Sequence, residues 1–154
     1  MDSKNNLIDL LPYGPEFRFV DLIHSVSESE IVGEFTFRKS LSFYQHHFLQ
    51  NPVTPGVILV ECMAQIGLVC LGIYLTQQNT ETRGNIALSN ANIDFLHPVL
   101  LGEKVTVRAA KVYFRFGKLK CNVSMENETG LRVCAGTLEG VAIPNKTKIH
   151  TSKI

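Results

Sequence analysis

One long apolar run constrains the fold of this chain more than any other feature. It reads GVILVECMAQIGLVCLGIYL, Gly56–Leu75, and every position from Val57 onward is apolar, Gly or Ala except Glu61 and Gln65. As a helix, this stretch reaches about 28 Å, enough to cross a membrane. However, a carboxylate near one end is costly in lipid, and the flanks lack paired aromatic and basic anchors. We therefore predict a helix enclosed in the core of a soluble domain, and no membrane span.

β-Strand patterns surround this helix. We expect two strands before it, at residues 17–23 and 30–37, and four after it, at residues 86–95, 104–116, 118–127 and 131–143. The connections among the last three are short, which favours antiparallel pairing, because a parallel crossover needs a dozen or more residues. A single apolar helix is buried if such a sheet curls around it, or if two sheets meet across a dimer.

Length and charge narrow the classes of protein further. With 154 residues the chain has room for one domain, expected at residues 1–145 and followed by a polar, flexible tail at residues 146–154. Fifteen Lys and Arg against fourteen Asp and Glu give a net charge of +1, which is too little for generic nucleic-acid binding. The opening MDSKNNLIDLLP lacks the pattern of a secretory signal, so we expect a cytoplasmic protein.

The four cysteines show no CxxC pair that would indicate a zinc or redox site. We expect buried, reduced thiols and no bound metal. A turn between Cys121 and Cys134 raises the idea of a cross-strand disulfide. Strand alternation argues against it, because it puts Cys121 on one face of the sheet and Cys134 on the other.

The chemically interesting groups are concentrated between residues 43 and 65. Thr54-Pro55-Gly56 predicts a helix start, with Thr54 as N-cap and Pro55 in the first helical position. Gly56 would then offer a backbone N–H at the positive end of the helix dipole. Glu61 and Gln65 are four residues apart and share a helix face, where apolar surroundings should disfavour the ionised carboxylate. A carboxyl kept neutral at pH 7 can act as a general acid.

Histidine completes this group. His47 precedes the helix in a segment that Pro52 and Pro55 stiffen, and imidazole is well matched to proton abstraction at neutral pH. Taken alone, a loop histidine or a Thr-Pro-Gly helix cap has a plain structural explanation. Gln65 is interpreted as a helper, and the remaining histidines are expected to be structural: His24, His46, His97 and His150.

The segment FYQHHFLQNPVTPGVILVECMAQ resembles the active-site stretch of the FabZ-like 3-hydroxyacyl-ACP dehydratases, a hot-dog-fold family. The family pattern is approximately F-F-x-G-H-F-P-G-x-P-V-M-P-G-V-x-x-x-E-A-M-A-Q. The likeness continues in LLPYGPEFRFVD, similar to the family's L-L-P-H-R-x-P-F-L-L-V-D, and in NANIDFLHPVLLGEKV, which parallels F-x-x-P-V-x-P-G-D. It runs from Leu10 to about Ile143.

This resemblance implies an α+β hot-dog fold, with a curled antiparallel sheet around one central helix. It also implies that His47 and Glu61 are the catalytic residues and that the Gly56 amide polarises the thioester carbonyl. Gly56, Val57 and Gln65 are the expected oxyanion and substrate-binding residues. In the family, the His and Glu of one site come from the two subunits of a dimer, and no metal or organic cofactor takes part. Glutamate, where related dehydratase-isomerases carry aspartate, favours dehydration without isomerisation.

The sequence departs from the family pattern close to His47. His46 replaces a glycine, Leu49-Gln50 replaces Pro-Gly, Thr54 replaces a methionine, and Pro12-Tyr13-Gly14 replaces Pro-His-Arg. Glycine positions can require positive φ or close backbone approach, so we expect the loop around His47 to be affected. The departures indicate a divergent branch that serves a specialised acyl or polyene pathway.

The predicted activity is dehydration of 3-hydroxyacyl-ACP thioesters to trans-2-enoyl-ACP, by a homodimer or a trimer of dimers. The alternatives are a hot-dog acyl-ACP or acyl-CoA thioesterase, and a non-catalytic acyl-binding partner subunit. Acyl carrier protein is acidic and needs a basic landing area. Six residues could provide it, or could be ordinary solvated strand positions: Lys104, Arg108, Lys111, Arg115, Lys118 and Lys120.

Overall fold

The computed structural model describes residues 3–77 and 85–143. Its secondary structure follows the expected order of two strands, a long helix and four strands. The helices are α1 (Ser3–Asp9), η1 (Pro15–Phe17), η2 (Ser42–Gln45), α2 (Gly56–Ala64), η3 (Gln65–Cys70) and α3 (Leu71–Leu75). The strands are β1 (Leu22–Val26), β2 (Glu30–Thr36), β3 (Ile86–Phe95), β4 (Lys104–Arg115), β5 (Lys118–Asn127) and β6 (Arg132–Ala142). The tail expected at residues 146–154 lies outside the described residues.

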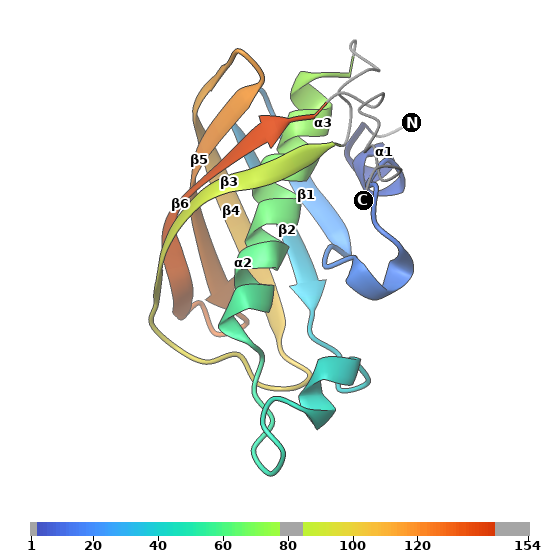
Figure 1. Cartoon of the computed structure of the whole chain (residues 1–154), viewed down its shortest axis with the longest axis vertical. Helices are drawn as coiled ribbons and strands as arrows, with labels where there is room; N and C mark the ends of the chain where they lie inside the picture. Colours follow the sequence, from blue (N-terminus) through green and yellow to red (C-terminus); the bar gives the residue numbers. More distant parts are fainter. Residues whose placement is uncertain (1–2, 78–84, 144–154) are drawn as a thin grey trace, which may run out of the picture.

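The strands form one antiparallel sheet in the order β1-β2-β4-β5-β6-β3. β3 follows the helix in sequence but joins the far edge of the sheet, beside β6. Figure 1 shows the sheet curling around the helix, with β1 and β2 on one side and β6 and β3 on the other. The predicted architecture of a curled sheet around one helix is confirmed.

The apolar run is the core helix of this sheet. α2, η3 and α3 follow one another without a break over Gly56–Leu75, and η3 has π-helical hydrogen bonding. Most of the run is buried inside the fold. Gly67 permits close packing, because a Cβ there would lie 3.0 Å from the Ala109 Cβ. An all-round apolar helix is therefore explained by a sheet that covers it on several sides.

The first strand begins later than predicted. The expected strand at 17–23 is wrong in its first half, because Phe17 ends the short helix η1 and β1 begins at Leu22. Here the backbone bonds to a helix side chain: the Phe19 N–H donates to Gln65 Oε1 at 2.8 Å, and Gln65 Nε2 donates to the Phe17 carbonyl at 2.9 Å. Pairing with β2 starts only at Asp21, whose N–H donates to the Glu34 carbonyl.

The helix start also differs from the prediction. α2 begins at Gly56, its N-cap is Pro55, and no side chain caps it. Thr54 is therefore not the N-cap. Its hydroxyl is hydrogen bonded to the Tyr44 hydroxyl instead, at 2.5 Å.

The four cysteines are buried free thiols, as predicted, but Cys134 does not lie on the outer face. Its Sγ lies 3.8 Å from Met63 Sδ, against the central helix. Alternation fails because the β5–β6 ladder shifts register near the turn, between Met125 and Glu126. Cys134 pairs with Met125, whereas Cys121 pairs with Leu138. The two cysteines are therefore too far apart along the strands to form a disulfide, although both face the helix.

Gly136→Ala should destabilise the fold. A Cβ at Gly136 would lie 1.9 Å from the backbone oxygen of Asn92 on β3, and a backbone contact cannot rotate away. We expect a loss of about 1–3 kcal/mol in the free energy of unfolding, measured by urea denaturation. Gly14→Ala is the matched control, because nothing lies within 4 Å of a Cβ there. Equal stability of the two variants would contradict this packing.

Candidate functional site

Three hydrogen bonds hold His47 in its loop, two made by its backbone and one by its ring. Its N–H donates to the Phe43 carbonyl at 2.9 Å, and its carbonyl accepts from the Val53 N–H at 2.9 Å. Its ring Nδ1 lies 3.0 Å from the Val53 carbonyl oxygen. A carbonyl only accepts, so Nδ1 carries the hydrogen of the neutral ring. The lone pair is therefore on Nε2, which is free to take a proton.

No described residue that replaces a glycine near His47 has a positive φ. His46 has φ −119° and ψ −18°, in the right-handed region. Among the described non-glycine residues, only Phe116 has a positive φ, and it lies in the β4–β5 turn. The side chains at His46 and Gln50 therefore do not require a positive φ, and the expectation that the loop around His47 is affected stays a prediction.

Gly56 begins α2, where the first amides of a helix have no acceptor within the helix. A mostly apolar pocket of about 290 Å³ lies beside it, and the Phe95 ring would be 3.2 Å from a Cβ at this position. The pocket is lined by Val53, Thr54, Gly56, Leu59, Phe95, Leu96, His97 and Pro98. An acyl thioester with its carbonyl at a helix N-terminus would suit these surroundings.

Phe95 and His97 line this pocket but are not among the residues that the sequence predicts for the site. The sequence predicts a structural role for His97 and places Phe95 at the end of a strand. The similarity of FLHPV to the family's F-x-x-P-V was the available signal, but it did not show that this segment packs against Gly56. Val57 has a 75% exposed side chain and does not line this pocket. His24 is paired with Glu34 at 3.1 Å, and His150 lies outside the described residues.

Gln65 connects Glu61 to the segment before β1. The Gln65 side chain is fully buried, and its Nε2 donates to Glu61 Oε2 at 3.0 Å as well as to the Phe17 carbonyl. Because its Oε1 accepts from the Phe19 N–H, the amide has one possible orientation. The prediction that Glu61 and Gln65 share a helix face is confirmed by this hydrogen bond, and the helper role of Gln65 stays a prediction.

Burial raises the pKa of Glu61 above its ordinary value, and the hydrogen bond from Gln65 partly offsets the rise. Tyr13 is partly buried in the same region. Desolvation, and then the charge of Glu61, raise the pKa of Tyr13 to about 12. Burial therefore shifts the pKa values of both neighbouring groups upward.

Different contacts hold His47 and Glu61 within one chain. No hydrogen bond or ion pair joins them in the described part of the structure. Gly56 faces Phe95 of β3, whereas Glu61 is bonded through Gln65 to the segment that leads to β1, at the opposite edge of the sheet. Within one chain, Gly56 and Glu61 therefore face different edges of the sheet.

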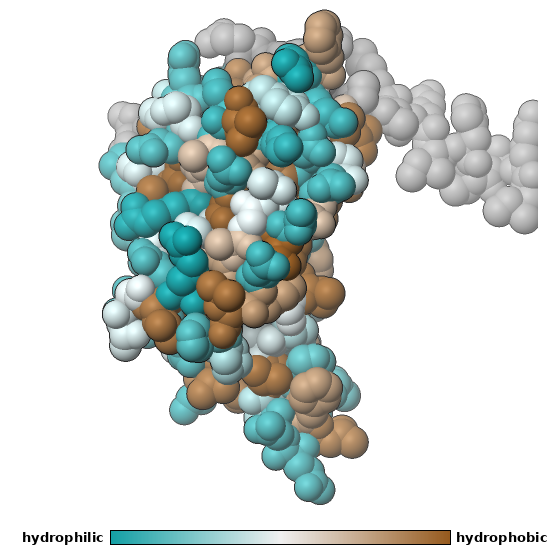
Figure 2. Space-filling model, turned by 90° about the vertical axis from the view of Figure 1, so that its left-hand side faces the viewer, coloured by the Kyte–Doolittle hydropathy of each residue, from teal (hydrophilic) through white to brown (hydrophobic). Residues whose placement is uncertain are grey.

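Apolar side chains are exposed around the base and the amide donor. Figure 2 shows apolar surface in the lower half of one face and on the loop that projects below it. The exposed residues in this part of the chain are Phe48, Leu49, Val57, Phe95, Leu96 and Leu100. A group of this kind is typical of a surface that another subunit or a ligand covers.

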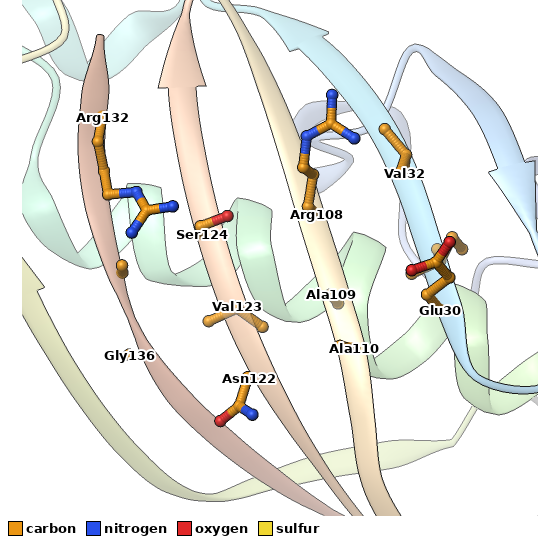
Figure 3. Close-up of a pocket in the computed structure, with 12 residues that line it drawn as sticks. Glu30, Val32, Arg108, Ala109, Ala110, Asn122, Val123, Ser124, Arg132 and Gly136 are labelled. Carbon is orange, nitrogen blue, oxygen red and sulfur yellow. The ribbon is translucent and has the colours of Figure 1, made fainter. Parts of the chain in front are cut away.

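A larger hollow, of about 420 Å³, lies on the outer face of the sheet and contains none of the candidate catalytic or substrate-binding residues. Figure 3 shows Arg108 and Arg132 at one end of it and Glu30 and Asn122 at the other, with the central helix behind the strands. The hollow exists because Ala110, Ser124 and Ala135 are small. It is separate from the pocket beside Gly56.

The six basic residues of β4 and β5 do not form one patch. Lys104 and Arg115 lie at opposite ends of a 12-residue strand, which spans about 36 Å at full extension. Three of the six make ion pairs: Lys104 with Glu34 at 3.7 Å, Arg108 with Glu126 at 3.5 Å, and Lys118 with Glu139 at 4.0 Å. Lys104 is the one that directly follows the loop beside the Gly56 pocket.

Comparison with known proteins decides the family. The family model for the FabA-like domain matches residues 11–130, most of the chain. The chain belongs to the FabA-like family. A 3-hydroxyacyl-ACP dehydratase FabZ from Clostridium perfringens is 27% identical over 142 residues, 90% of this chain and 96% of that protein. A FabZ dehydratase from Geobacter metallireducens is 32% identical over 109 residues, 69% of this chain and 71% of that protein.

Solved structures confirm the hot-dog fold of this FabA-like chain. The dehydratase heterocomplex ApeI:P from Xenorhabdus doucetiae matches with a TM-score of 0.74 and 16% identity, covering 90% of this chain and 91% of that one. A thioesterase from Haemophilus influenzae matches with a TM-score of 0.68 and 19% identity, covering 97% and 96%. Within the described residues, no three His, Cys, Asp or Glu side chains gather to hold a metal ion.

Glu61→Gln should raise stability at neutral pH. Because burial raises the pKa of Glu61, the folded protein holds this proton more tightly than the unfolded chain does. The resulting stabilisation is complete below the ordinary glutamate pKa and is lost as the pH rises through the folded-state pKa. Glutamine has no such loss, so we expect equal unfolding temperatures at pH 4 and a gain of about 2 °C for the variant at pH 7.

The comparison requires one fixed protein concentration, because association also shifts the unfolding temperature. Glu30→Gln, an exposed change on β2, is the matched control and should show no such trend. A gap between Glu61→Gln and wild type that stays constant from pH 4 to pH 7 would refute the raised pKa.

Proposed function

We propose that this chain dehydrates 3-hydroxyacyl thioesters, carried on acyl carrier protein, to trans-2-enoyl thioesters. The observation that carries the proposal is the bond between His47 Nδ1 and the Val53 carbonyl, which leaves Nε2 as a base on the loop that leads into a helix N-terminus. Membership of the FabA-like family and the dehydratase names of the relatives support it. The pathway is fatty-acid synthesis or a specialised polyene or polyketide-type synthesis.

In the proposed mechanism, His47 Nε2 removes a proton from C2 of the substrate. The electron pair of that C–H bond moves onto the thioester oxygen, where the Gly56 N–H stabilises the developing negative charge. The electrons then return to form the C2–C3 double bond while the C3–O bond breaks. Glu61 gives its proton to the departing hydroxyl, which leaves as water. Exchange with solvent returns the imidazole and the carboxyl to their starting states.

Glu61 has to come from a second subunit in this mechanism. The separation of His47 and Gly56 from Glu61 within one chain supports a shared site, and the exposed apolar residues around Gly56 offer a surface for the partner. The outer edge of β3 has no partner strand in the described sheet. We therefore propose a homodimer or a trimer of dimers, with Val57 and Gln65 contributing to the assembled substrate site.

Acyl carrier protein is the proposed partner and the cytoplasm the proposed location. Lys104 is the best placed of the six basic residues to contact the carrier, because it begins β4 directly after the loop beside Gly56. The thioesterase neighbours share the fold at 19% identity or less. The competing reaction is therefore hydrolysis of the acyl thioester. Dehydration produces the ultraviolet absorbance of a conjugated enoyl thioester, whereas a thioesterase releases free thiol.

His47→Ala should reduce dehydration of a 3-hydroxyacyl-ACP by about 10²–10⁴-fold, because it removes a positioned general base. Glu61→Gln should do the same by removing the general acid. The assay follows enoyl absorbance with purified protein, and circular dichroism checks the fold. His46→Ala, next to the base and exposed, is the control and should retain activity within about threefold. Full activity of His47→Ala or Glu61→Gln would exclude the assigned roles.

Mixing the two inactive variants should restore turnover. If each site takes His47 from one subunit and Glu61 from the other, a dimer of His47→Ala with Glu61→Gln has one complete site and one doubly defective site. Random exchange of subunits then gives about a quarter of wild-type activity. The measurement is enoyl formation after co-refolding, compared with each variant refolded alone. No recovery in subunits shown to have exchanged would place both residues in one chain's site.

A further inference from the structure

Two buried hydroxyl groups meet at the base of the loop that carries His47. Tyr44 and Thr54 are each 4% exposed, and their side-chain oxygens are 2.5 Å apart. They are ten residues apart in the sequence and bracket His47. The family pattern has phenylalanine and methionine at these two positions, so two differences from the pattern are in direct contact here.

The hydrogen bond joins the two segments that fix the imidazole. Tyr44 belongs to η2, and the His47 N–H donates to the carbonyl of Phe43, the residue just before it. Thr54 directly follows Val53, whose carbonyl accepts from His47 Nδ1. Movement of either segment would therefore change the position or the tautomer of the ring.

Thr54 also connects the base to the amide donor. Its N–H donates to the Val99 carbonyl at 3.0 Å, which ties it to the loop between β3 and β4. It lies two residues before Gly56 and lines the same pocket. The hydroxyl pair is thus placed to set the spacing between the imidazole and the Gly56 N–H.

The pair suits a positioning role better than a catalytic one. Burial raises the pKa of Tyr44, so its hydroxyl keeps its proton at neutral pH. A buried hydroxyl left without a partner costs about 1–3 kcal/mol, so the two groups hold each other firmly in place. A phenylalanine and methionine pair would fill the same space without this directional constraint.

We propose that Tyr44 and Thr54 are positioning residues, whose hydrogen bond holds His47 in register with the Gly56 amide. This inference rests on the proposed function. In this chain the bond restrains a loop that lacks the proline and the glycines of the family pattern.

The test separates positioning from stability. Thr54→Val and Tyr44→Phe each leave one buried hydroxyl unpaired and should lower both the unfolding temperature and kcat. The double variant Tyr44→Phe/Thr54→Val leaves none unpaired, so it should regain most of the lost stability. Its kcat for enoyl formation should stay about 10- to 100-fold below wild type, because a displaced catalytic group is costly, while KM changes by less than threefold.

Two controls accompany these variants. Thr54→Ser keeps the hydroxyl and should keep kcat within about threefold of wild type. Tyr113→Phe removes another tyrosine hydroxyl, which donates to Glu139 near the β4–β5 turn, and should leave kcat unchanged. A double variant with wild-type kcat, or a Thr54→Ser variant as slow as Thr54→Val, would overturn the proposal.

A second readout does not depend on turnover. ¹⁵N NMR of the His47 ring should show hydrogen on Nδ1 in wild type and Thr54→Ser, and a mixture of tautomers in the double variant. An unchanged tautomer and ring environment in the double variant would overturn the positioning role even if the chain catalysed another reaction. Loss of the tautomer preference in the double variant, together with a wild-type protein that forms no enoyl product, would leave positioning supported and refute the proposed function.

Discussion

A glutamine amide without access to water holds three parts of this molecule in one arrangement. Gln65 is buried in the central helix, and a buried amide must find partners for its donors and its acceptor. It finds them in the Phe17 carbonyl, the Phe19 N–H and the Glu61 carboxylate. The requirement to satisfy one polar group thus fixes the chain before β1 and orients the carboxyl.

The apolar helix and the curled sheet make that requirement strict. The helix has so few polar positions that nearly all of its surface has to be covered, and the sheet covers it from several strands (Figure 1). Glu61 remains near the edge of this cover, close enough to the interior for its pKa to rise and exposed enough to meet a ligand. Before the N-terminus of the same helix, a hydrogen bond to the Val53 carbonyl fixes the tautomer of the His47 ring.

The local sequence pattern was sufficient to predict the strands whose limits no distant side chain changes. β3 and β5 have the predicted limits, because alternation and turn residues are local properties of the chain. The errors occur where a distant side chain decides. Gln65 competes for the backbone at Phe17 and Phe19, and a register shift near Met125 brings Cys134 to the inner face. The Thr54 hydroxyl, predicted to cap the helix, is hydrogen bonded to the Tyr44 hydroxyl instead.

The candidate residues were identifiable by type and motif, and the family resemblance already implied that the His and Glu of one site come from two subunits. The structure adds that no hydrogen bond or ion pair joins His47 and Glu61 within the described part of one chain. That separation makes the proposed enzyme subject to mass action. A subunit released by dilution would retain its fold's internal bonds and its base, yet have no acid opposite it. Specific activity would then fall with total protein concentration below the dissociation constant of the assembly, so the cell could limit the reaction simply by how much of the chain it synthesises.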